Sequence, residues 1–162
     1  MRQRRRPEQP TGWRRLLLRL PIHCYRLGLG WLLGTRFLLI NHVGRRTGRP
    51  RTVVVEVVDH DVRSDTWIVA SGLGPTADWY RNLTATPDVT IRVGRRTIPV
   101  TAHPLIGDEG ADTMVRYAAA HPRTARRLAG FMGFEVDGSE RDYRALGRAI
   151  PFVRFVPRRA AI

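Results

Sequence analysis

The residues best suited to chemistry form a basic turn, residues 44–52, which read G-R-R-T-G-R-P-R-T. Four arginines, two glycines and one proline stand there between two apolar runs. Glycine and proline in so short a connection predict a turn between strands. Four guanidinium groups repel one another unless water screens them or an anion lies among them. The basic turn is therefore either a solvated hairpin tip or, as we predict, an anion-binding site.

Other catalytic patterns are missing from the sequence. It has no H-E-x-x-H, no G-x-S-x-G, no G-x-x-x-x-G-K-[ST] and no paired cysteines. The five histidines show no metal-ligand spacing, and the single Cys24 in an apolar stretch is expected to be inert. We therefore predict no metal site. A bound cofactor must supply any redox chemistry, which agrees with an anion-binding turn.

The charge distribution separates two basic regions. The chain has a formal net charge of +14, and its 28 basic residues are all arginine. Residues 1–58 hold thirteen of these arginines but only two acids, whereas the rest of the chain is closer to balance. A uniformly basic nucleic-acid binder does not need this gradient, and no aromatics alternate with the arginines of the turn to stack on bases. The pattern favours a basic arm plus one arginine-lined site over nucleic-acid binding.

Six apolar, β-rich runs predict strands that would hold the basic turn. They span residues 37–43, 53–58, 66–70, 89–93, 97–101 and 152–156. Gly94-Arg95 between two of these runs predicts a two-residue hairpin, and Pro99 predicts an edge strand or a bulge. Helical periodicity predicts helices near residues 77–85, 111–118, 125–132 and 139–150. The predicted fold class is α+β, with mostly antiparallel strands in a small closed or half-closed barrel and inserted helices.

The N-terminal third outside this domain divides into two parts. Residues 1–11 form a predicted flexible basic tail, and residues 12–34 a predicted amphipathic helical arm; the domain follows over residues 35–159. The longest uncharged run in the arm is too short to span a bilayer. The arm either packs on the domain or lies on an anionic membrane surface through its arginines, Trp13 and leucines. With one cysteine and no disulfide framework, we expect a cytoplasmic protein, peripheral on the inner face of the cell membrane in the second case.

The order of these segments resembles the deazaflavin-dependent nitroreductase family. The likeness is carried by the basic turn, then Val69-Ala70-Ser71-Gly72, then D-W-Y-R-N-L at residues 78–83, then T-P-D-V at residues 86–89. The resemblance implies an FMN-binding split-barrel-like fold that binds coenzyme F-420, a deazaflavin with a phosphodiester and glutamate tail. FMN, which relatives of this barrel hold, is the alternative cofactor.

The resemblance also implies roles for individual residues. The phosphate and tail would be held by Arg45, Arg46, Thr47, Gly48, Arg49, Pro50, Arg51 and Thr52. The ring would lie against a glycine segment made of Ala70, Ser71, Gly72, Leu73 and Gly74, with Trp79 and Asn82 packing beside the pocket. On the acceptor side, Tyr143 matches a family tyrosine that lines the substrate, and Glu56 would reach the acceptor if its side chain pointed into the barrel.

Two departures from the family pattern concern the acceptor more than the cofactor. Many members have Ser-Lys-Gly-Gly followed by His-Pro, where this chain has residues 71–74 as S-G-L-G followed by Pro75-Thr76. Residues 53–56 are V-V-V-E where nitro-activating members carry a tyrosine. The predicted function is hydride transfer from reduced coenzyme F-420 to an electron-poor acceptor such as a quinone, an enone or a nitroaromatic. The alternatives are an FMN-dependent reductase or a non-catalytic basic module.

Overall fold

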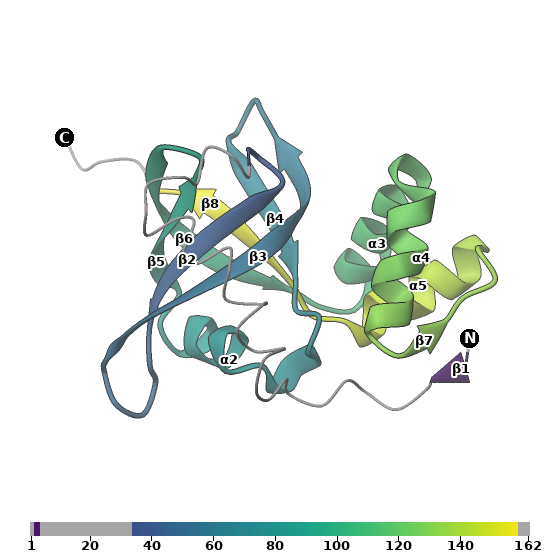
Figure 1. Cartoon of the computed structure of the whole chain (residues 1–162), viewed down its shortest axis with the longest axis horizontal. Helices are drawn as coiled ribbons and strands as arrows, with labels where there is room; N and C mark the ends of the chain where they lie inside the picture. The colour runs from purple at the N-terminus through teal and green to yellow at the C-terminus, as the bar shows by residue number, and fades with distance from the viewer. Residues whose placement is uncertain (1, 4–33, 159–162) are drawn as a thin grey trace.

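The computed structural model describes residues 2–3 and 34–158 (Figure 1). In chain order the strands are β1 (Arg2–Gln3), β2 (Phe37–Val43), β3 (Pro50–Asp61), β4 (Thr66–Ala70), β5 (Asp88–Val93), β6 (Arg96–Leu105), β7 (Phe134–Glu135) and β8 (Phe152–Pro157). The helices are a 3-10 turn η2 (Gly74–Thr76), α2 (Asp78–Ala85), α3 (Asp108–Ala120), α4 (Pro122–Phe131) and α5 (Glu140–Ala149).

Six strands close into one antiparallel barrel in the order β2-β3-β4-β8-β6-β5. This confirms the predicted α+β split-barrel fold. Alternate residues of each strand point inward, which is why the β-branched runs were recognisable as half-buried strands. The interior is filled by apolar side chains from all six strands and α2, among them Leu38, Ile40, Trp67, Val69, Leu83, Ile91, Val100, Val153 and Phe155.

Two strands are longer than the sequence predicted. β3 extends from Pro50 to Asp61, because it pairs with β2 over its first half and with β4 from Val57 onward, across a bulge between Val57 and Asp59. β6 continues to Leu105, paired with the start of β8. At each extended end, hydrogen bonding to one neighbouring strand carries residues into a strand that their own propensities do not favour.

The hairpin at Gly94-Arg95 is confirmed, with Val93 opposite Arg96 and Gly94 at a φ of +57°. The edge position predicted from Pro99 is wrong, because β6 lies between β5 and β8. The β6–β8 pairing begins only at Val100, so Pro99 uses its carbonyl alone there, accepting from the Arg158 N–H at 2.9 Å. A proline is tolerated where the ladder has not yet begun.

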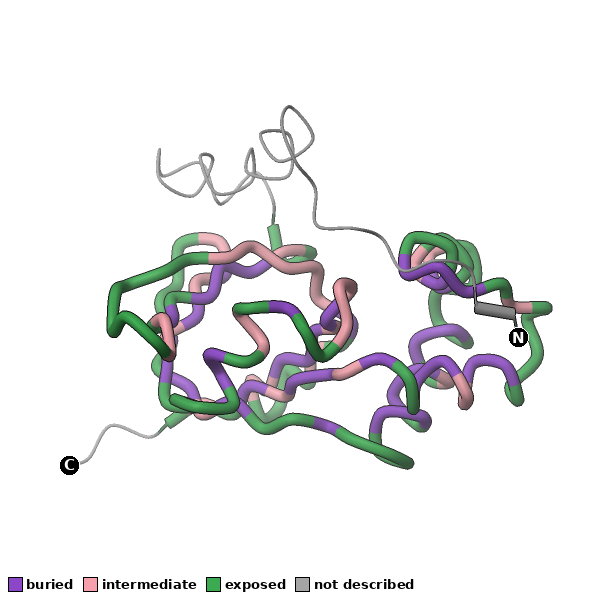
Figure 2. Tube along the Cα trace, turned by 90° about the horizontal axis from the view of Figure 1, so that it is seen from below, coloured by how far each residue is buried: buried purple, intermediate pink, exposed green. Residues whose placement is uncertain are grey.

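Helices α3, α4 and α5, with β7, form a helical lobe over residues 108–150 beside the barrel (Figure 1). The ends of β6 and β8 lead into and out of this lobe, with Leu105 opposite Phe152. Helices α3 and α5 cross so closely that a Cβ on Gly147 would lie 2.7 Å from the Cα of Ala111. Figure 2 shows buried residues in both the barrel and the lobe. The apolar cluster of the lobe also takes in Val58, Ile68, Leu105 and Phe152 from the barrel strands.

The N-terminal predictions fall almost entirely outside the described residues. Within the predicted tail, Arg2–Gln3 form β1, which pairs antiparallel with β7. In the part of the chain that the structure describes, no helix is both long enough and apolar enough to cross a membrane.

Candidate functional site

The basic turn is built around two glycines. The Gly44 N–H donates to the Arg49 carbonyl at 2.9 Å, and the Gly48 N–H donates to the Gly44 carbonyl at 2.8 Å. Gly48 has a φ of +63°, a left-handed conformation that side chains rarely adopt. A Cβ on Gly44 would lie 2.9 Å from the Thr47 hydroxyl oxygen. Pro50 to Thr52 already belong to β3, so the turn proper ends at Arg49.

Arg45 fastens the turn to helix α2. Its Nη1 donates to the carboxylate of Asp78 and to the side-chain oxygen of Asn82, both at 3.0 Å, and its backbone N–H donates to the same Asn82 oxygen at 3.0 Å. Its side chain is only 23% exposed. The guanidinium group of Arg45 is therefore bound to Asp78 and Asn82 within the protein. The sequence had predicted that Arg45 would bind the anion together with the other arginines.

Asn82 joins the turn to the barrel interior through His42, one of the five histidines that show no metal-ligand spacing in the sequence. The side-chain nitrogen of Asn82 lies 3.1 Å from Nδ1 of His42, which is buried. Because the Asn82 oxygen already accepts from Arg45, this nitrogen is the donor and His42 Nδ1 the acceptor. Burial lowers the pKa of His42 and the charge of Arg51 lowers it further, while Asp78 opposes the shift. A neutral imidazole therefore completes the support of the basic turn.

Three arginines remain for a ligand. Arg46, Arg49 and Arg51 are exposed, and within residues 34–158 none of them has a carboxylate partner. They lie on or just after the turn that Arg45 anchors, so their backbone positions are held before any ligand arrives. Preorganised guanidinium groups suit phosphate and carboxylate oxygens, which they bind in pairs.

An open groove of about 430 Å³ begins beside one of these arginines, Arg51. It runs over the outer face of β2, β3, β5 and β6, where its lining residues are Leu39, Asn41, Pro50, Thr52, Arg92 and Thr97. Arg51 also lines it, from a register position opposite the buried His42. Its volume lies within the usual range for small-molecule sites. The sequence reasoning found Arg51 but not Asn41, Arg92 or Thr97. Their outward positions follow from strand alternation, but the pairing that makes them neighbours is not visible in the sequence.

The glycine segment, Ala70 to Gly74, joins the end of β4 to η2 and α2. Ser71 is buried; its N–H donates to the Pro151 carbonyl at 2.8 Å and its hydroxyl donates to the Gly74 carbonyl at 2.7 Å. Gly74 has a φ of +75° and its N–H donates back to the Ser71 carbonyl at 2.8 Å. These bonds fix a tight loop. After η2 the chain enters α2 at Asp78, the residue that Arg45 contacts. The structure thus brings the glycine segment and the basic turn to the same helix.

The remaining predicted residues are farther from this arrangement. Trp79 packs against the barrel cluster and meets Tyr80 edge to face, with ring centroids 6.1 Å apart. Glu56 does not point into the barrel, because Val55 and Val57 take the inward positions and Glu56 pairs with Arg36 at 3.2 Å outside. Tyr143, 5% exposed, packs in the apolar cluster of the helical lobe.

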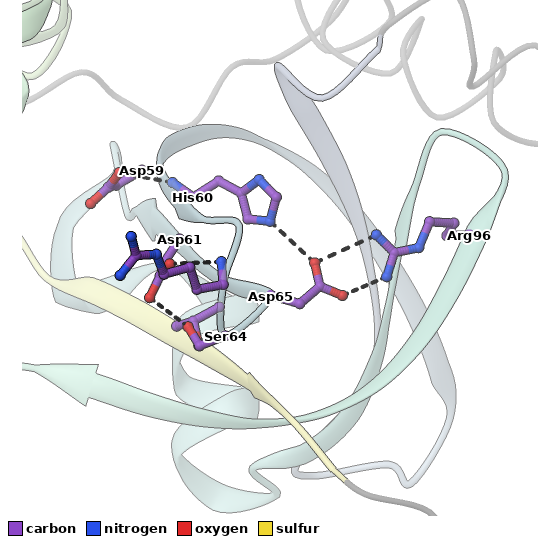
Figure 3. A network of polar contacts seen from close by, with 8 residues as sticks. Asp59, His60, Asp61, Ser64, Asp65 and Arg96 are labelled. Carbon is purple, nitrogen blue, oxygen red and sulfur yellow. Dashed lines mark hydrogen bonds and ion pairs between the residues drawn. The ribbon is translucent and has the colours of Figure 1, made fainter.

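A second polar cluster closes the opposite end of the barrel (Figure 3). The carboxylate of Asp65 pairs with Arg96 and lies 3.1 Å from Nε2 of His60, whose ring stacks on Trp67 at 3.4 Å. Burial raises the pKa of Asp65, but hydrogen bonds from Arg96 and His60 outweigh it and leave the pKa below its ordinary value. These groups satisfy one another, so the cluster fits a structural role. Among the described residues no group of three or more His, Cys, Asp or Glu side chains is placed to hold a metal ion.

Sequence comparisons agree on one family. A family model described as F420H(2)-dependent quinone reductase matches residues 22–130. A putative F420H(2)-dependent quinone reductase of Mycobacterium tuberculosis is 35% identical over 88 residues, covering 53% of this chain and 72% of that protein. An F420H(2)-dependent quinone reductase of the same strain is 34% identical over 98 residues, covering 55% of this chain and 63% of its own length.

Comparison with solved structures supports the fold. An F420-H2 dependent reductase superposes with a TM-score of 0.51 at 22% identity, over 74% of this chain and 93% of that chain. A protein of unknown function from Agrobacterium tumefaciens superposes with a TM-score of 0.54 at 14% identity, over 93% of this chain and 58% of that chain. At these identities the likeness shows the fold alone.

Proposed function

The chain belongs to the F420H(2)-dependent quinone reductase family, and we propose that its basic turn holds the anionic part of the coenzyme while the glycine segment receives the ring. Family membership makes the protein an oxidoreductase whose cofactor is coenzyme F-420, as the sequence predicted, with a small-molecule electron acceptor. The family supports coenzyme F-420 over the FMN alternative. The observation that carries the placement is the set of three exposed arginines beside an anchored turn.

The residues present fit the charged part of such a coenzyme. Arg46, Arg49 and Arg51 offer guanidinium donors without a carboxylate partner among residues 34–158. Each charge-assisted hydrogen bond to a phosphate or carboxylate contributes about 1.5–3 kcal/mol, so two or three contacts support micromolar affinity with modest help from ring burial. The groove that starts at Arg51 has room for the tail to continue over the sheet.

When bound and reduced, the coenzyme supplies a hydride from its deazaflavin ring, and a quinone that takes up the hydride and a proton becomes a hydroquinone. The chain's own contribution is to hold the coenzyme by its charges, to orient the ring against a rigid loop and to keep water from it. The Ser71 hydroxyl stabilises the conformation of that loop, since it donates its hydrogen to the Gly74 carbonyl. Gly72 and Gly74 place no side chain of their own between the main chain and a flat ring, although Phe131 and Met132 already cover the Cβ side of Gly72.

The proposed donor role of Tyr143 rests on the family resemblance, because the structure places this residue among packing side chains of the lobe. A Tyr143→Phe variant keeps the ring and removes the hydroxyl. If Tyr143 donates to the acceptor, this variant lowers turnover and leaves coenzyme affinity unchanged. Equal turnover in the two proteins would remove Tyr143 from the site.

The placement of the coenzyme is tested by titrating the protein with oxidised coenzyme F-420 and following its fluorescence. An Arg49→Ala/Arg51→Ala double variant should lose about 10-fold or more in affinity per lost contact, because one charged contact accounts for roughly that factor. The matched control is Arg63→Ala/Arg123→Ala, which removes the same charge away from the basic turn. Equal losses in the two double variants would mean that only net charge matters. Tighter binding of FMN than of coenzyme F-420 by the wild-type protein would refute the cofactor placement.

We also propose that residues 1–33 attach the protein to an anionic membrane surface, where lipophilic quinones dissolve. The proposal rests on sequence: this segment holds eight arginines and one acid, interleaved with Trp13 and many leucines. Deletion of residues 1–33 should abolish sedimentation with phosphatidylglycerol liposomes and leave coenzyme affinity unchanged. If the full-length protein ignores these liposomes, the membrane proposal fails and the coenzyme proposal is unaffected.

A further inference from the structure

We propose that Phe131 forms the acceptor side of the site, with its exposed ring as the surface on which a flat, lipophilic quinone packs beside the coenzyme. This inference rests on the proposed function and adds the residue that receives the acceptor. Phe131 is the last residue of α4 and lies just beyond the residues that match the family model. Sequence reasoning did not single it out.

The exposure of Phe131 distinguishes it from the buried apolar residues of its helix. The small apolar residues Ala125 and Ala129 turn inward and are fully buried, whereas Phe131 is 56% exposed. Complete burial of such a side chain would stabilise the fold, and this position leaves about half of that burial unrealised. A single exposed apolar residue is common on a protein surface, so exposure alone does not mark a site.

What distinguishes Phe131 is its contact with the glycine segment. A Cβ on Gly72 would lie 3.3 Å from Cε1 and 3.7 Å from Cδ1 of Phe131, and 3.7 Å from Cε of Met132. One edge of the aromatic ring therefore rests on the main chain of the loop proposed to receive the deazaflavin. The rest of the ring faces solvent, next to that loop.

The space between the glycine segment and the helical lobe does not admit a flat ligand. The cavity between the glycine segment and the helical lobe, lined by Gly72, Met132, Phe134 and Ile150 among others, has a volume of about 10 Å³. That volume holds about one water molecule. An acceptor that approaches the glycine segment from the side of the lobe consequently meets the exposed ring of Phe131.

The surroundings of this ring suit a quinone. Arg127 precedes Phe131 by four residues on α4, so the two lie on the same helix face, and both are exposed. Within the described residues Arg127 has no carboxylate partner. An aromatic surface with one cation a turn away offers stacking to the ring of the acceptor, and a positive charge near the oxygen that becomes negative as hydride arrives.

The test measures the binding of menadione, a naphthoquinone, to protein saturated with oxidised coenzyme F-420, so that no turnover occurs. Phe131→Ala should raise the dissociation constant for menadione about 10-fold, because stacking and apolar contact are lost, while coenzyme affinity stays within about twofold. Phe131→Tyr keeps an aromatic ring and should bind menadione within about threefold of wild type. Val62→Ala, at a 79% exposed apolar residue of the β3–β4 turn, is the control and should change neither constant.

The outcomes of these titrations distinguish failure of the proposed role of Phe131 from failure of the proposed function. An unchanged menadione constant in Phe131→Ala, with coenzyme still bound, overturns the role of Phe131 and leaves the proposed function intact. A parallel loss of coenzyme and menadione affinity, together with a lower melting temperature, shows a structural residue and also overturns it. Absence of coenzyme binding in the wild-type protein refutes the proposed function itself.

Discussion

Replacing Asn82 by alanine tests whether helix α2 holds the basic turn in place. Asn82 is 4% exposed, accepts from the backbone N–H and Nη1 of Arg45, and donates to Nδ1 of His42. The alanine variant loses all three bonds and leaves a buried imidazole nitrogen without a donor. Arg45 keeps its contact with Asp78, which limits the loss.

The expected cost follows from these contacts. Two lost hydrogen bonds contribute about 0.5–1.5 kcal/mol each, and an unpaired buried acceptor adds about 1–3 kcal/mol. Because Arg45 and nearby water recover part of this, we expect the free energy of unfolding to fall by about 2–4 kcal/mol. For a chain of this length, each kcal/mol lowers the melting temperature by about 2–4 °C, so the shift should be about 5–15 °C.

The measurement is urea unfolding followed by circular dichroism, with Thr84→Ala as the control. Thr84 is exposed on the same helix and donates only to the Arg81 carbonyl at 2.8 Å, so its loss should cost less than about 0.5 kcal/mol. A loss in Asn82→Ala that is no larger than in Thr84→Ala would refute the reasoning. The turn would then be held by its own main-chain bonds, such as Gly48 N–H to the Gly44 carbonyl.

Two further predictions concern pH and helix packing. The pKa of His42 is lowered in the folded protein. Between the ordinary histidine pKa of about 6.5 and this lower folded pKa, the unfolded chain therefore binds more protons than the folded protein. The free energy of unfolding should be level above pH 6.5 and should fall as the pH drops from about 6.5 through the folded pKa. A His42→Gln variant, which offers Asn82 an acceptor that does not titrate, should lose this part of the slope in urea titrations at pH 7.5 and 5.0, and parallel curves would contradict the assignment. In the helical lobe, a Cβ on Gly147 would clash with the main-chain oxygen of Gly110 and lie 2.8 Å from Cβ of Met114, so Gly147→Ala should destabilise the protein by about 1–3 kcal/mol. Gly130→Ala, in α4 with nothing within 4 Å of the added carbon, should instead stabilise the protein by up to about 1 kcal/mol. Thermal melts of the two variants measure both effects, and a stability change of the same sign in the two variants would refute the close crossing of α3 and α5.

Local chemistry explains why much of the fold was predictable. Runs of β-branched residues and the Gly94-Arg95 hairpin depend on neighbours in sequence. The start of the helix near residues 139–150 is equally local, since the Ser139 hydroxyl accepts from the Asp142 N–H at 3.2 Å. Strand ends were less predictable, since β3 and β6 are extended by hydrogen bonds to strands distant in sequence. The edge position inferred from Pro99 failed for the same reason, because closure of the barrel is decided by pairing and not by one residue.

The sequence by itself determined that this chain carries an arginine-rich turn between strands and, through the order of its segments, the family and coenzyme. Those properties reside in residue types and short spacings. Only the tertiary structure decided which arginines are available: Arg45 is occupied by Asp78 and Asn82, from a helix more than thirty residues away, while Arg46, Arg49 and Arg51 face solvent. The tertiary structure also buried His42 behind Asn82 and set Phe131 against Gly72. Charge and burial at each of these positions depend on partners that the chain meets only when it folds.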